Sequence, residues 1–200
     1  MRIERQGKTL FLVLAAMLAL AIGSAACTEK PWRTKSIAGL MPALEFDLTA
    51  EDGRRVTADD YRGKVVVLFF GYSHCPDVCP TTLAKLAGAT ARSSRPEDVR
   101  VLFVSVDPAR DTPQVLRAYT DAFGAEIIGL SGTRDALNRL TKRYRVTYGY
   151  GEPDASGDYP VSHSSAVFVF DEQGEARLLV RDSDPVDAIV ADLDRLIVES

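Results

Sequence analysis

The sequence lacks a run of Lys and Arg, and this absence argues against nucleic acid as a partner. The chain has 24 Lys and Arg against 28 Asp and Glu, for a net charge of −4, and no Lys/Arg-rich run stands out. Its aromatic residues are scattered rather than laddered. Internal repeats and low-complexity segments are also absent. For 200 residues that are 46% hydrophobic, one globular domain is therefore the simplest organisation.

The sequence also lacks an apolar run of the length that a membrane span usually needs, which is about 20 residues. The nearest approach is Leu10–Ile22, which follows Arg2, Arg5 and Lys8 and precedes the letters GSAAC. A basic start, an apolar stretch of about 13 residues and a small-residue exit are typical of an export signal. We predict that residues 1–27 are an export signal or a retained membrane anchor.

Cys27 stands where such a signal would be cut. The letters GSAAC resemble a bacterial lipobox in which Ser24 replaces the usual Leu. Cleavage after Ala26 without acylation would leave an odd thiol in an oxidising compartment. We expect a lipidated Cys27 to tether the protein at the periplasmic face of the cell membrane. A retained anchor and plain export are the alternatives.

Residues 28–39 are mixed and polar and are predicted to be a tether, and residues 40–200 are predicted to be the folded domain. The domain opens with ALEFDLTAEDGRRVT, whose alternation and Asp52-Gly53 turn predict a hairpin. Two later segments, KVVVLFFGY and VRVLFVSVD, are continuously apolar. Such runs are typical of central strands covered on both faces.

Helices and strands alternate through the rest of the chain. We expect a strand at IIGLSG, a hairpin at HSSAVFVFDEQGEARLLVR, and four helices over residues 80–94, 113–123, 134–144 and 185–198. This order predicts an α/β sandwich with a mixed central sheet, an N-terminal hairpin and helices on both faces.

Cysteine is scarce, yet two of the three cysteines share one turn, in FGYSHCPDVCP. Cys75 and Cys79 lie after a buried strand and before a helix, where open α/β sheets place their sites. Pro80 favours the first helical position, so we predict that Cys79 is the N-cap. A helix N-terminus also favours a thiolate.

The pair can be a structural disulfide, a redox couple or a metal clamp. A disulfide across so short a loop would stabilise the fold weakly. Thioredoxin-type redox motifs usually have two residues between the cysteines, whereas three stand here and leave room for an ion. Two thiolates suit Cu(I), and zinc would accept them too.

Two ligands are few for a metal ion, so a third should be sought among the histidines, of which the chain has two, His74 and His163. His74 adjoins Cys75 and should point the opposite way, which makes it a poor partner. His163 is expected on a loop that enters an apolar strand, in DYPVSHSSAVFVF. From the residues alone, a structural role for His163 stays open.

Four segments in this order resemble the SCO/SenC family, over roughly residues 40–198: FGYSHCPDVCPTTL, SVDPARDTP, GLSGTRDALNRLTKRYRV and DYPVSHSS. The resemblance implies a thioredoxin-like fold, a membrane tether and a location in the periplasm or its mitochondrial equivalent. It further implies copper bound by two cysteines and a distant histidine, and a role in assembling the dinuclear copper centre of cytochrome c oxidase.

Carried onto this sequence, the resemblance implies that Cys75, Cys79 and His163 are the copper ligands. Ser162 departs from the family, in which many members have an aspartate before the histidine. Such a carboxylate would support the ligand from outside, so its loss is expected to tune affinity and not to abolish binding. Asp107 and Asp111 are interpreted as loop and helix-start residues, or as residues that shape the rim, and not as ligands.

The leading hypothesis is a copper chaperone that passes copper to cytochrome c oxidase subunit II. It implies a periplasmic copper donor and a thioredoxin-like reductant. The main rival is a thiol–disulfide oxidoreductase that uses Cys75 and Cys79 as its redox pair. A peroxidase with Cys75 as the reactive thiol and a general periplasmic copper store are further alternatives.

Overall fold

The computed structural model describes residues 30–199. The chain divides into Met1–Pro31 and a compact unit, Trp32–Ser200. The predicted export signal or anchor and Cys27 lie outside the described residues. Among the helices of residues 30–199, none is long and apolar enough to cross a membrane.

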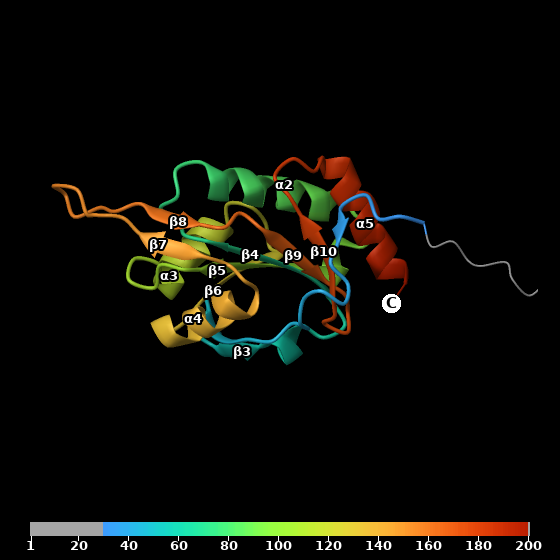
Figure 1. Ribbon diagram of the computed structural model, residues 1–200, viewed down its shortest axis with the longest axis horizontal. Helices are drawn as coiled ribbons and strands as arrows, with labels where there is room; N and C mark the ends of the chain where they lie inside the picture. The colour runs from blue at the N-terminus through green and yellow to red at the C-terminus, as the bar shows by residue number, and fades with distance from the viewer. Residues whose placement is uncertain (1–29, 200) are drawn as a thin grey trace, which may run out of the picture. The chain divides into compact units, whose positions relative to one another are not determined.

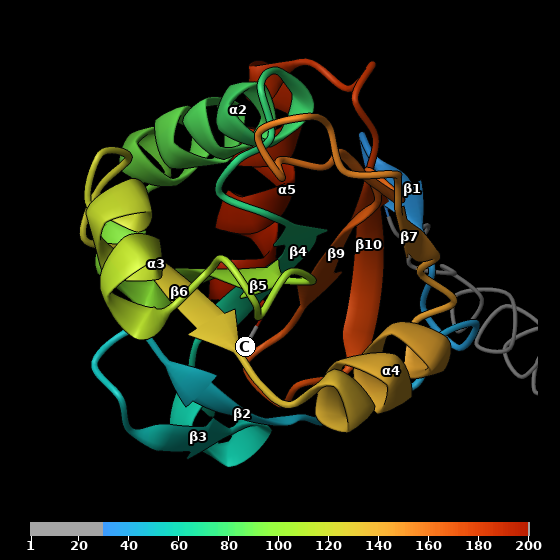
Figure 2. The ribbon, with the colours of Figure 1, turned by 90° about the vertical axis from the view of Figure 1, so that its left-hand side faces the viewer.

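A mixed eight-stranded sheet forms the centre of the compact unit (Figure 2). Its three middle strands, β4, β5 and β6, run parallel, and the other neighbours pair antiparallel. Along the sheet the order is β1 (Lys35–Ser36), β10 (Ala176–Val180), β9 (Val167–Phe170), β4 (Val65–Gly71), β5 (Val99–Ser105), β6 (Ile127–Ser131), β2 (Asp47–Ala50) and β3 (Arg55–Thr57).

Helices cover both faces of the sheet. They are α2 (Val78–Arg92), α3 (Pro113–Thr120), α4 (Arg134–Arg143) and α5 (Val186–Val198), with short 3-10 turns η1 (Ala58–Tyr61) and η2 (Pro96–Asp98). Figures 1 and 2 show α2 beside α5 on one face and α4 on the other, and α3 packs against β6. The predicted α/β class, mixed sheet, N-terminal hairpin and two covered faces are confirmed.

The central strands are apolar throughout because each of their faces meets a layer of side chains. Phe69 of β4 packs on Phe103 of β5, and Phe103 packs on Tyr119 of α3, with ring centroids 6.0 and 5.4 Å apart. The next residue, Phe70, points to the other face and lies 6.5 Å from the ring of Tyr144, which caps α4. Every residue of β4 is buried, as expected for a strand covered on both sides.

Part of the range that we predicted to be a tether is held on the domain. Lys35–Ser36 forms β1 at the edge of the sheet and pairs with β10. The buried carboxylate of Asp192 in α5 accepts hydrogen bonds from the backbone N–H of Arg33 (3.0 Å) and of Thr34 (2.7 Å), and from the Thr34 hydroxyl (2.8 Å). Ordered structure therefore begins before residue 40.

A second, two-stranded sheet lies apart from the first and was not predicted. It joins β7 (Tyr148–Tyr150) to β8 (Val161–His163), and Figure 1 shows this hairpin projecting from one end of the unit. Its strands are three residues long, and the intervening sequence is rich in Gly, Pro and Asp. Such a stretch has the composition of a loop, so the pattern concealed the hairpin.

Several helix bounds also differ from the prediction by one to three residues. The helix predicted over residues 80–94 spans Val78–Arg92, and the closing helix predicted from Pro185 begins at Val186. The helix predicted through Phe123 ends at Thr120, since turns come after it and Gly124 has a φ of 132°, which L side chains rarely adopt. The helix predicted through Tyr144 ends at Arg143.

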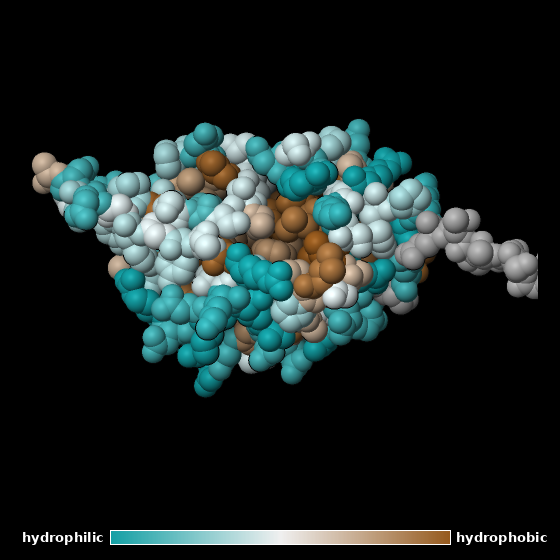
Figure 3. Space-filling model, in the orientation of Figure 1, coloured by the Kyte–Doolittle hydropathy of each residue, from teal (hydrophilic) through white to brown (hydrophobic). Residues whose placement is uncertain are grey.

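Figure 3 shows an apolar area in the middle of one face, over β9 and β10, with hydrophilic atoms around it.

Candidate metal centre

The two cysteines lie where β4 passes into α2. Cys75 is in the connecting turn, and its backbone N–H donates to the Tyr72 carbonyl (3.2 Å). Cys79 is the second residue of α2, and Asp77 is the N-cap, so the prediction that Cys79 caps the helix is wrong. The first turn of a helix has no internal partners for its N–H groups, so proline is tolerated beyond the first position and Pro80 does not fix the start.

Cys79 is fully buried, and its sulfur lies in space that is free because Gly71 has no side chain. A Cβ on Gly71, the last residue of β4, would stand 2.7 Å from the Cys79 sulfur and 2.6 Å from the Phe103 ring. Real Cβ atoms essentially never approach so closely. Gly71 therefore makes the position of this sulfur possible, and Cys75 lies half-buried nearby.

His163 reaches the cysteines from far along the chain. It is the last residue of β8, not a loop residue as expected, and it pairs with Tyr148 of β7. Its Nε2 lies 3.2 Å from the Cys79 sulfur, across 84 residues of sequence. Its Nδ1 lies 3.0 Å from the Ser164 carbonyl oxygen, which only accepts, so Nδ1 carries the hydrogen. In the neutral ring the Nε2 lone pair therefore faces the sulfur.

The ligand atoms of Cys75, Cys79 and His163 all lie within 4.8 Å of one another. His74 stays outside this group. Its Nδ1 is 3.0 Å from the Ser73 hydroxyl and 3.7 Å from the Asp111 carboxylate. In residues 30–199 this is the one group of three such side chains that can hold a metal ion.

The two thiols differ in their tendency to ionise. Burial opposes ionisation of Cys75, but the N–H groups of Asp77, Cys79 and Val78 and the Cys79 thiol outweigh it, so the pKa of Cys75 is lowered. Burial raises the pKa of Cys79 strongly, and the neighbouring Cys75 adds to the rise. The half-buried sulfur is thus the readier thiolate, and the buried one holds its proton.

Buried carboxylates hold the loops around this group. Asp111 accepts from the backbone N–H of Ser73 (3.0 Å), from the Ser73 hydroxyl and from the Ser105 hydroxyl (both 2.5 Å). This ties the cysteine turn to the segment after β5. Asp107 is 0% exposed and bonds to Arg110 and Tyr159, so neither aspartate belongs to the metal-binding group.

Two further residues bear on the site in ways that the sequence did not reveal. Ser162, which departs from the family pattern, is exposed, and its hydroxyl donates to the Gly149 carbonyl across the hairpin (3.3 Å). The ring of Tyr72 meets that of His163 edge-on, with centroids 6.0 Å apart. The position of Gly71 at the end of a strand, just before a chemically active turn, was the available signal for its role.

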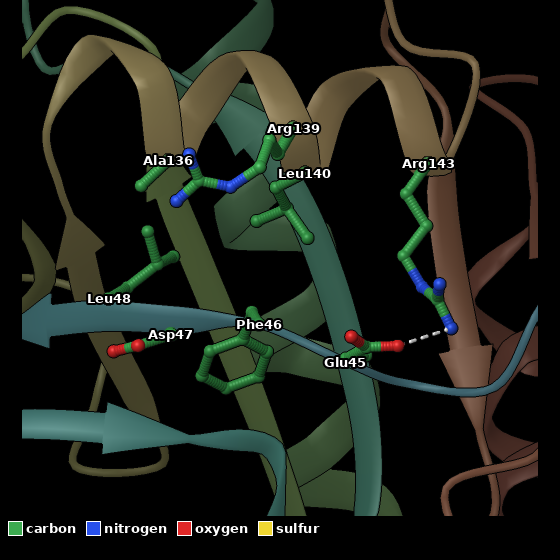
Figure 4. A pocket seen from close by; sticks show the side chains of 8 residues that line it. All are labelled: Glu45, Phe46, Asp47, Leu48, Ala136, Arg139, Leu140 and Arg143. Carbon is green, nitrogen blue, oxygen red and sulfur yellow. Dashed lines mark ion pairs between the residues drawn. The ribbon is translucent and has the colours of Figure 1, made fainter.

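A separate hollow between β2 and α4 has a different chemistry (Figure 4). It measures about 270 Å³ and is lined by apolar side chains together with Glu45, Asp47, Arg139 and Arg143. Arg143 pairs with Glu45 at 2.9 Å. No cysteine or histidine lines this hollow, so it has no part in the group formed by Cys75, Cys79 and His163.

With this geometry established, comparison with known proteins identifies the family. Residues 40–198 match the family described as SCO1/SenC. The chain belongs to the SCO1/SenC family. The resemblance found in the sequence motifs is therefore confirmed.

Individual SCO1/SenC relatives show how far the likeness extends. The human mitochondrial SCO1 homolog is 37% identical over 134 residues, which cover 65% of this chain and 44% of that protein. The SenC protein of Rhodobacter capsulatus is 35% identical over 175 residues, which cover 82% of this chain and 79% of that one. The match thus spans about half or less of several mitochondrial relatives.

A solved SCO1/SenC structure shares the fold. The crystal structure of Arabidopsis thaliana ScoI with copper bound superposes with a TM-score of 0.73 at 33% identity, covering 79% of this chain and 99% of that one. The thioredoxin-like fold predicted from the resemblance is confirmed.

Proposed function

We propose that this chain binds copper through Cys75, Cys79 and His163 and acts as a copper chaperone in the assembly of cytochrome c oxidase. The observation that carries the proposal is the convergence of two sulfurs and one imidazole nitrogen within 4.8 Å. Family membership supports it, as does the copper in the ScoI relative. Thiolates suit Cu(I), and an imidazole accepts either oxidation state of copper.

Copper binding requires both thiols to be reduced and to lose their protons. Because burial raises the pKa of Cys79, binding must release the proton that this thiol holds. We expect the affinity for copper to rise with pH. A disulfide between Cys75 and Cys79 removes both sulfur ligands, so the proposal includes a thioredoxin-like reductant and a periplasmic copper donor as partners.

Copper is the cargo, and the position of the site allows it to leave. Cys75 and His163 are half-buried, and Val78, which stands between the cysteines, is an exposed apolar residue (42%). A partner that docks over this rim can take copper by stepwise exchange of ligands. We propose the dinuclear copper centre of cytochrome c oxidase subunit II as the recipient, at the periplasmic face of the membrane.

The second candidate is a thiol–disulfide oxidoreductase, and the unequal thiols favour it. The Cys75 thiolate would attack a disulfide in the target protein and form a mixed disulfide. The Cys79 thiolate, after losing its proton to water, would then attack the Cys75 sulfur. The target would leave as a dithiol, and the two electrons would come from the Cys75–Cys79 pair.

The two candidates separate in one transfer experiment. Reduced protein, copper-loaded or copper-free, is mixed with the soluble copper-centre domain of oxidase subunit II in its dithiol or disulfide form. The chaperone predicts copper transfer from the loaded protein, lost in His163→Ala, while disulfide exchange survives in that variant. Reduction of the disulfide form without any copper transfer would make the chain a reductase.

The membrane tether rests on Cys27, outside the described residues. We propose that Cys27 is the acylated N-terminus of the mature protein. Mass spectrometry of protein from membranes should then find an N-terminus at Cys27 carrying a lipid mass. An unmodified Cys27 terminus would indicate plain export, and an intact Met1 a retained anchor.

A further inference from the structure

The histidine of the copper site is carried by a weak element. β7 and β8 have three residues each and pair only with each other. An isolated two-stranded hairpin is marginally stable in water. The hairpin must therefore be held by side-chain contacts if the His163 imidazole is to stay 3.2 Å from the Cys79 sulfur.

A buried carboxylate in the loop after β5 makes the first of these contacts. Asp107 is 0% exposed. It accepts from Arg110 Nε (2.5 Å) and from the hydroxyl of Tyr159, in the long connection of the hairpin (2.9 Å). Hydrogen bonds to a buried charge are among the stronger ones in proteins. Asp107 thus joins the loop to the hairpin.

The Arg110 guanidinium extends this link to the cysteine turn. Its carbon lies 3.8 Å from the centre of the Tyr159 ring and 5.6 Å from that of Tyr72. It also pairs with Asp158 of the hairpin. Tyr72 directly precedes the cysteine turn, and its ring meets the His163 ring. The Arg110 side chain is 16% exposed, which strengthens such cation–ring contacts by limiting solvation.

A second tyrosine of the hairpin is tied to the same loop. The Tyr150 hydroxyl donates to the Val106 carbonyl (2.6 Å), and its ring packs on Tyr159 with centroids 5.8 Å apart. On its other contact, Tyr150 meets Arg134 of α4, 4.9 Å from the ring centre. Arg134 is therefore one of the contacts that hold the hairpin. The exposed Arg139 of the same helix lines the separate hollow by β2 instead, so it offers a matched control.

We propose that Arg110 is a positioning residue for His163. Held by Asp107 and placed between Tyr72 and Tyr159, its guanidinium fixes the β7–β8 hairpin against the cysteine turn before copper arrives. This inference rests on the proposed copper site. Arg110 does not touch copper. Arg110 acts by keeping the His163 imidazole beside the two thiols. Copper binding then does not have to supply the free energy that would order the hairpin.

The test is a double-mutant cycle with the full-length reduced protein in detergent. The affinity for Cu(I) is measured by competition with a chromophoric chelator for wild type, Arg110→Ala, His163→Ala and the double variant. Supporting groups around metal ligands are worth roughly 10–100-fold in affinity. We expect Arg110→Ala to weaken binding at least tenfold in the wild-type background and to have no effect when His163 is already alanine.

Two more variants separate positioning from general damage to the fold. Tyr159→Phe removes the hydroxyl that reaches Asp107 but keeps the ring, and it should weaken binding in the same His163-dependent way. Arg139→Ala should leave the affinity unchanged. The inference is overturned if Arg110→Ala and Tyr159→Phe bind copper like wild type, or if their loss is equal in both backgrounds. If His163→Ala itself binds normally, the three-ligand site fails instead.

Discussion

At the scale of single residues, the site depends on a glycine, Gly71, which has no side chain to fill the space beside the cysteines. Gly71 leaves room for the Cys79 sulfur at the end of β4. The Ser164 carbonyl then fixes the hydrogen of His163 on Nδ1 and leaves Nε2 facing that sulfur. The ligand set is thus arranged by groups that do not bind copper themselves.

Gly71→Ala tests this dependence. The added methyl would overlap the Cys79 sulfur and the Phe103 ring, so we expect weaker copper binding and a loss of about 1–3 kcal/mol in the free energy of unfolding. Gly88→Ala in α2 is the matched control, because a Cβ there meets nothing within 4 Å. It should stabilise the helix by about 0.5–1 kcal/mol and leave copper binding intact. Wild-type affinity in Gly71→Ala would show that the thiol has freedom to move.

Distance along the chain decided which site residues could be predicted from the sequence. Cys75 and Cys79 stand in one turn, so their spacing alone marked a site. His163 is 84 residues from Cys79, and only the family resemblance singled it out. The place of Gly71 at the end of a strand was a local signal for its role, whereas the role of Arg110 arises from contacts between segments, which no local pattern records.

At the scale of elements, predictability depended on length and burial. β4 and β5 have seven residues each and are covered on both faces. Their continuous apolar runs therefore predicted buried central strands. The helices starting at Pro113 and Arg134 come after Thr N-caps that accept from the backbone, and a threonine at this place marks a helix start in the sequence. β1, β7 and β8 have two or three residues and no alternation, and tertiary contacts define them.

Asp192→Ala tests how β1 is held. Three hydrogen bonds from Arg33 and Thr34 end on this carboxylate, so its loss should lower the free energy of unfolding by about 2 kcal/mol. Amide exchange of residues 33–37 should become faster. Asp187→Ala is the control, since its pair with Arg92 is exposed and worth little. Unchanged exchange in Asp192→Ala would mean that pairing with β10 alone holds the strand.

At the scale of the whole molecule, the proposed copper site joins two distant segments. The cysteine turn comes directly after the central strand β4, whereas the hairpin lies outside the main sheet. Loops and hairpins that carry sites are usually the less stable parts of a fold. A ligand that binds only the folded state stabilises it, by about 4 kcal/mol at a thousandfold excess over its dissociation constant.

Copper should therefore raise the melting temperature and slow amide exchange in two segments, residues 72–82 and residues 156–165. In His163→Ala the second segment should lose its protection, while the first keeps part of its own. Hydrogen exchange measured by mass spectrometry resolves the two segments. Protection confined to the cysteine turn in wild type would assign His163 a structural role and favour the reductase.

The most direct test of the three-ligand site is a Cu(I) titration of the reduced chain beginning at Lys30, which keeps the contacts of Thr34 with Asp192. Stoichiometry and affinity are measured for wild type, Cys75→Ser, Cys79→Ser and His163→Ala. The three-ligand site predicts one copper per chain in wild type, with binding greatly weakened in each cysteine variant and clearly weakened in the histidine variant. Unchanged affinity in any of the three variants would contradict it.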